Sequence, residues 1–140
     1  MTYRTLQTVV FLAIAGLVAA CGGETALSQE DFISQAEEIC ASSNEDLDSI
    51  GEELTADSTD EEVEDVAVQA ADTIEGAIDQ IRELGAPEGT QDELNAILDD
   101  TTAALDELRE DPVGMMERGE DPLADVSDRL SAFGLEECGG

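Results

Sequence analysis

Apolar side chains recur at intervals of three and four residues through three long stretches of this chain. Because an α-helix has about 3.6 residues per turn, that spacing places them on one face of a helix. No stretch shows the period-two alternation of Val, Ile, Thr and Tyr that indicates a strand. The pattern therefore predicts an all-α protein, and the short turns between the stretches favour antiparallel neighbours.

The three long helices have recognisable ends. Ser28 is a good N-cap for the first, whose apolar face extends to Leu54 unless Gly51 ends it earlier. Ser58 to Glu61 predicts a capping box for the second, which ends before Gly85. Thr90 to Glu93 predicts another capping box for the third, which ends near Arg109.

Two proline pairs interrupt the remainder of the chain. Asp111-Pro112 and Asp121-Pro122 each have the form of an N-cap followed by proline at the first helical position. They predict a short helix over 112–118 and a longer one over 122–133, capped by Gly134, with 135–138 as a tail. We therefore expect residues 28–140 to form an antiparallel up-down bundle of three long helices and an interrupted fourth.

The amino-terminal segment is expected to be a targeting segment rather than part of the folded domain. Arg4 precedes an uncharged run from Val9 to Ala20, which is shorter than the roughly 20 residues needed to span a bilayer. Residues 1–20 therefore predict a secretory signal peptide. Val18-Ala19-Ala20-Cys21 resembles the lipobox of bacterial lipoproteins. The resemblance implies lipidation of Cys21, a tether over 21–27, and anchoring at the extracytoplasmic face of the cell membrane.

The number of cysteines is consistent with a location outside the cytoplasm. The chain has three cysteines, Cys21, Cys40 and Cys138. If Cys21 is lipidated, the other two suit one disulfide in an oxidising compartment. Their spacing excludes a zinc knuckle or a thioredoxin-type C-x-x-C motif.

Three short motifs resemble a set of small helical envelope proteins of actinobacteria. They are Glu38-Ile39-Cys40-Ala41 early in the first helix, Gly134-Leu135, and the final Cys138-Gly139. The resemblance implies a disulfide-closed helical bundle and carries no established activity.

Charge and composition exclude several functions. The chain has 36 acidic residues, five arginines and no histidine, giving a formal net charge of −31. Such a polyanion has no basic patch to hold nucleic acid phosphates. Histidine-dependent acid–base and di-metal chemistry is ruled out, and a serine or cysteine nucleophile lacks its usual base. EF-hand frames starting at Asn44 or Asp46 both fail. We expect no catalytic residue, cofactor or metal site.

The acidic surface has two interpretations. It is a solvated face suited to a saline exterior, or its clusters bind cations or a basic partner. The clusters are Glu52-Glu53, Asp57 with Asp60 to Glu62, and Asp99-Asp100. Carboxylate crowding should also raise native pKa values, so that salt or low pH stabilises the fold.

The favoured function is that of a non-enzymatic, membrane-anchored lipoprotein presenting an acidic helical bundle as a structural or protein-interaction module. Its expected partners are the membrane, through Cys21, and an envelope protein or cations. The alternative is a solute- or cation-binding envelope lipoprotein, and an enzyme is the least favoured interpretation.

Overall fold

The computed structural model describes residues 27–140, so the expected signal peptide and Cys21 lie outside the described residues. Within that range the chain is all helical, which confirms the predicted fold class. No helix there has both the length and the apolar character that crossing a bilayer requires. The elements are α1 (Gln29–Gly51), α2 (Asp60–Leu84), α3 (Gln91–Glu110), α4 (Pro112–Arg118), α5 (Ala124–Phe133) and α6 (Glu136–Gly139).

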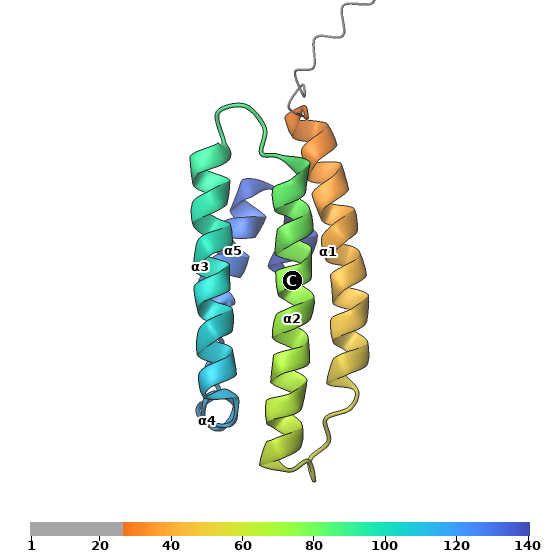
Figure 1. Ribbon diagram of the computed structural model, residues 1–140, viewed down its shortest axis with the longest axis vertical. Coiled ribbons are helices and arrows are strands. Elements are labelled where there is room, and N and C mark those ends of the chain that lie inside the picture. The colour runs from red at the N-terminus through yellow and green to blue at the C-terminus, as the bar shows by residue number, and fades with distance from the viewer. Residues whose placement is uncertain (1–26) are drawn as a thin grey trace, which may run out of the picture.

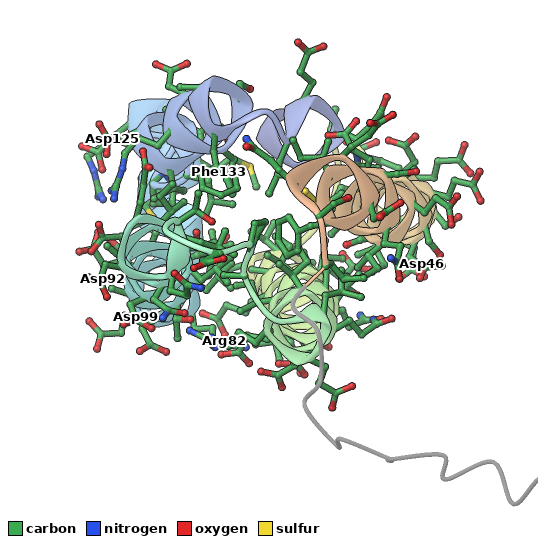
Figure 2. The ribbon with its side chains drawn as sticks, turned by 90° about the horizontal axis from the view of Figure 1, so that it is seen from above. Asp46, Arg82, Asp92, Asp99, Asp125 and Phe133 are labelled. Carbon is green, nitrogen blue, oxygen red and sulfur yellow. A yellow bond between two sulfur atoms is a disulfide. The ribbon has the colours of Figure 1, made fainter. Side chains whose placement is uncertain are left out.

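The first three helices run side by side in alternating directions, and α5 lies behind them (Figure 1). Helix α1 packs on α2, α2 on α3, α3 on α5, α5 on α6, and α6 on α1. The helices therefore form a ring around a common core, as Figure 2 shows from above. Two short helices, α5 and α6, make the fourth side, while α4 packs against α2 and α3.

The core is centred on large side chains that are almost completely buried. The least exposed are Phe32, Leu94, Leu98, Leu105 and Leu135. Burial of each contributes about 1.5–3 kcal/mol relative to an exposed position. The rings of Phe32 and Phe133 meet edge to face with centroids 6.4 Å apart, which joins α1 to α5.

The predicted apolar face of α1 is buried over only part of its length. Phe32, Ala36 and Cys40 are buried, whereas Leu47 and Ile50 are half-buried. The reason is the length of the fourth side. Helix α1 has 23 residues and α5 has 10, so α1 extends beyond the cover that α5 and α6 provide.

The helix caps match the predictions in part. Ser28 Oγ accepts a hydrogen bond from the Asp31 backbone N–H at 3.1 Å, as predicted. The capping box of α2 forms one residue later than predicted, between Thr59 and Glu62, because Ser58 Oγ instead accepts from the Thr55 N–H at 2.9 Å. The predicted box at Thr90 is wrong. The Thr90 hydroxyl donates to the Pro87 carbonyl at 3.0 Å and does not cap α3.

The interrupted last section is confirmed, with two differences. Helix α4 has the predicted bounds, and the Asp111 carboxylate accepts from the Gly114 N–H at 3.1 Å. Helix α5 begins at Ala124, two residues later than predicted, because the Asp121 carboxylate accepts from the Leu123 N–H at 2.9 Å and forms a turn. The predicted tail forms the short helix α6.

Candidate functional site

A disulfide joins the middle of α1 to α6. Cys40 and Cys138 are 98 positions apart in sequence, and their Cα atoms lie 5.0 Å apart, which confirms the predicted bridge. Two hydrogen bonds flank it. Asn44 Nδ2 donates to the Glu137 carbonyl at 2.8 Å, and the Glu137 N–H donates to Glu37 Oε1 at 3.1 Å. Helix α6 is therefore held against α1 at three points.

A glycine turn brings the chain to this position. Gly134 ends α5 with a φ of 106°, which a residue with a side chain rarely adopts. The Leu135 N–H donates back to the Leu130 carbonyl at 2.9 Å, and the Leu135 side chain is fully buried. The reversal points α6 toward α1, so Cys138 reaches Cys40.

An apolar cavity lies next to the disulfide, between α1, α2, α3, α5 and α6. Its volume is about 200 Å³. None of its lining residues is acidic or basic, although 36 of the chain's 140 residues are acidic. The lining comprises Cys40, Ser43, Asn44, Leu47, Ile74, Ala77, Ile78, Ile81, Leu98, Thr101, Leu123, Val126, Ser127, Leu130, Cys138, Gly139 and Gly140.

Two polar side chains in the wall of this cavity, Asn44 and Thr101, are already hydrogen-bonded within the chain. The buried Thr101 hydroxyl donates to the Ile97 carbonyl at 2.8 Å, and the Asn44 amide donates to Glu137. Throughout residues 27–140, no buried side-chain nitrogen or oxygen lacks a hydrogen-bond partner. The wall therefore suits an apolar occupant, because a charged one would lose its hydration without compensation.

Sequence reasoning missed this cavity. Helical periodicity places Ile78, Leu98 and Leu130 on inward faces, but it does not say whether they fill the space between them. The hollow arises where small residues of different helices face the same space. Ser43, Ala77 and Ser127 are such residues, and no spacing in the sequence marks their meeting.

All four arginines of residues 27–140 form ion pairs. Arg82 Nη2 lies 2.8 Å from Asp99, and Arg109 Nη2 lies 2.8 Å from Asp72 and 2.7 Å from Glu75, so two arginines join α2 to α3. The other cross-link joins α5 to α3, through Arg129 and Asp100 at 2.6 Å, whereas Arg118 pairs locally with Asp111 and Glu120.

Two titratable groups show what these contacts do. Hydrogen bonds, first with Glu75 and then with Asp72, raise the pKa of Arg109 above its already high usual value, so it stays charged. At Glu62 the backbone N–H and then the hydroxyl of Thr59 lower the pKa. The direction at Glu62 is opposite to the raised values expected from carboxylate crowding.

The acidic clusters singled out in the sequence do not converge on one point. Asp99 pairs with Arg82 of α2, whereas Asp100 pairs with Arg129 of α5, so these two adjacent carboxylates point toward different helices. Glu62 is occupied by the α2 capping box. In the part of the chain that the structure describes, no group of three His, Cys, Asp or Glu side chains is placed to hold a metal ion.

Comparison with protein-family models, curated proteins and solved structures finds no match to this chain.

Proposed function

We propose that this chain is a non-enzymatic lipoprotein of a bacterial envelope, anchored through Cys21 to the extracytoplasmic face of the membrane. Its acidic bundle serves as a structural or protein-interaction module. One observation supports the interaction module. Every arginine of residues 27–140 is already paired with carboxylates of the same chain, and many carboxylates point outward around the rim of the bundle in Figure 2.

Helix α1 is the best candidate for the interacting face. Of the ion pairs among residues 27–140, none involves a residue of α1. Its outer side carries Glu38, Glu45, Asp46 and Asp48, all exposed. A surface with one sign of charge accelerates association with a partner of the opposite sign and repels like charges. The complementary partner is therefore a basic envelope protein.

The anchor is tested by replacing the expected lipidation site. Cys21→Ser should abolish acylation of the chain and leave the amino-terminal segment uncleaved, whereas Gly23→Ser should change neither. Mass spectrometry of the intact protein gives both readouts. An acylated or cleaved product from Cys21→Ser would contradict the proposal.

The interaction face is tested by charge reversal with a matched control. Glu38→Lys with Glu45→Lys changes the net charge of α1 by the same amount as Glu107→Lys with Glu110→Lys changes that of α3. Cross-linking in intact cells should capture a basic partner in the native chain and the α3 variant, and much less in the α1 variant. Equal capture by both variants would contradict an interface on α1.

The alternative, a solute-binding envelope lipoprotein, is favoured by the apolar cavity beside the disulfide. The cation-binding version is tested separately, by calorimetric titration with calcium and magnesium at high sodium concentration. Saturable, stoichiometric binding would favour it over the interaction module.

A further inference from the structure

We propose that the cavity beside the Cys40–Cys138 disulfide binds one small apolar molecule, either neutral or bearing a cationic head group. The proposal concerns residues 27–140 alone, and it holds whether or not Cys21 carries a lipid.

The size of the cavity indicates the size of the ligand. An engineered apolar cavity of about 150 Å³ stays dry and holds benzene. The cavity here has about 200 Å³ and is lined by Ile78, Leu98 and Leu130 among others. It therefore suits a single ring or an alkyl chain of about six carbons.

The side chains that line the cavity disfavour a charged group of the ligand inside it. No acidic or basic side chain lines the cavity, and the Thr101 hydroxyl is committed to the Ile97 carbonyl. A ligand's charged group would therefore remain at the mouth, where the net charge of the whole chain acts on it. A net charge of −31 repels an anionic head group and attracts a cationic one.

Helix α6 forms part of the wall and is held there by the disulfide. Cys138 and Gly139 line the cavity, and the flanking contacts from Asn44 and Glu37 reach only Glu137. Reduction of the disulfide leaves α6 attached by those hydrogen bonds and by the buried Leu135. Binding should therefore be weaker in the reduced protein.

The test uses the full chain carrying Cys21→Ser, because that variant has no thiol at residue 21 to carry an acyl chain that would compete for the cavity. Three six-carbon probes differ only in their head group: n-hexanol, hexylammonium and hexanoate. Titration calorimetry should show one molecule of hexanol bound per chain. At low salt, hexylammonium should bind more tightly than hexanoate, and the difference should shrink in 1 M NaCl as screening increases.

Filling the cavity gives the matched comparison. Ser43→Leu and Ser127→Leu place an isobutyl group into it from α1 and α5, and neither hydroxyl has a side-chain hydrogen bond in the structure to lose. Each should lower hexanol affinity at least tenfold. Ser49→Leu makes the same change at an exposed position of α1 and should leave affinity unchanged.

The location is tested independently of these variants. Nuclear Overhauser contacts from hexanol should reach the methyl groups of Ile78 and Val126, and should not reach Val68, which is 43% exposed outside the cavity. Absence of saturable hexanol binding by the folded protein would overturn the proposal. So would contacts at Val68 alone, or equal affinity losses in Ser49→Leu and the cavity-filling variants.

Discussion

Breaking the Cys40–Cys138 bridge should remove a large share of the stability of the fold. The bridge closes a loop with a sequence separation of 98 residues. In the chain-entropy model, a loop of about 100 residues contributes about 4.7 kcal/mol at 25 °C, and measured values are often lower. Domains of this size have unfolding free energies of roughly 5–15 kcal/mol. We therefore expect reduction to lower the free energy of unfolding by about 3–5 kcal/mol.

The structure also predicts where the reduced protein loosens first. Without the bridge, α6 keeps two hydrogen bonds to α1, from Asn44 to Glu137 and from Glu137 to Glu37. Each contributes about 0.5–1.5 kcal/mol in general, and exposed ones fall at the low end. Amide exchange of α6 should therefore accelerate before that of α3, which keeps its arginine ion pairs to α2 and α5.

The assay is urea denaturation followed by far-ultraviolet circular dichroism, with and without reductant, in 1 M NaCl and a Cys21→Ser background. For a urea m-value of about 1.5 kcal/mol per M, the expected loss lowers the midpoint by about 2–3 M. Double replacement by Cys40→Ala and Cys138→Ala should give a similar fall. Coincident midpoints for oxidised and reduced protein would refute the loop-entropy reasoning.

Four further outcomes follow from the same contacts. Arg109→Met should lower the urea midpoint more than Arg118→Met, because Arg109 joins two helices and Arg118 pairs locally, and the difference should shrink in 1 M NaCl. Phe32→Ala should cost about 3–5 kcal/mol in the same assay, since the ring is fully buried. The thermal midpoint of the native protein should rise from dilute buffer to 1 M NaCl, because few cations offset the carboxylates, and an unchanged midpoint would contradict this. Thr59→Ala should raise the pKa of Glu62 only in part in an NMR titration, because it removes the hydroxyl but keeps the backbone N–H, which is the larger cause of the lowered pKa. Since the folded pKa of Glu62 lies below its usual 4.5, its contribution to stability is present above that pH and is lost as pH falls through the folded value.

Local signals in the sequence were sufficient for the helices and several of their ends. The three-and-four spacing identified α1, α2 and α3, and Asp111-Pro112 marked α4 with its observed bounds. Similar signals failed where a neighbouring group competed for the same polar atoms. Thr90 donates to Pro87 instead of capping α3, and Asp121 forms a turn instead of starting α5 at Pro122.

The candidate site could be predicted only in part, because its two components depend on different information. The disulfide followed from counting cysteines once Cys21 was assigned elsewhere, whereas Gly134 was predicted only as the cap of α5 and not as the turn that brings Cys138 to Cys40. The cavity depends on how far the fourth side reaches along α1 and on which small residues meet across the bundle. Those are properties of tertiary packing, which periodicity does not encode.

Two kinds of cross-link hold the bundle together, arginine ion pairs on one side and the disulfide on the other, and the cavity lies between them. Arginines join α3 to both of its neighbours, through Arg82 and Arg109 to α2 and through Arg129 to α5. Helix α1 takes part in none of the ion pairs found among residues 27–140, and the disulfide holds it to α6 instead. The cavity lies between these two sets of cross-links, with Leu98 from the arginine-linked side and Cys40 from the disulfide side in its wall. Reduction would therefore loosen α6 and change the wall of the cavity while leaving the arginine pairs of α3 intact, which makes occupancy of the cavity sensitive to the redox state of a single bond.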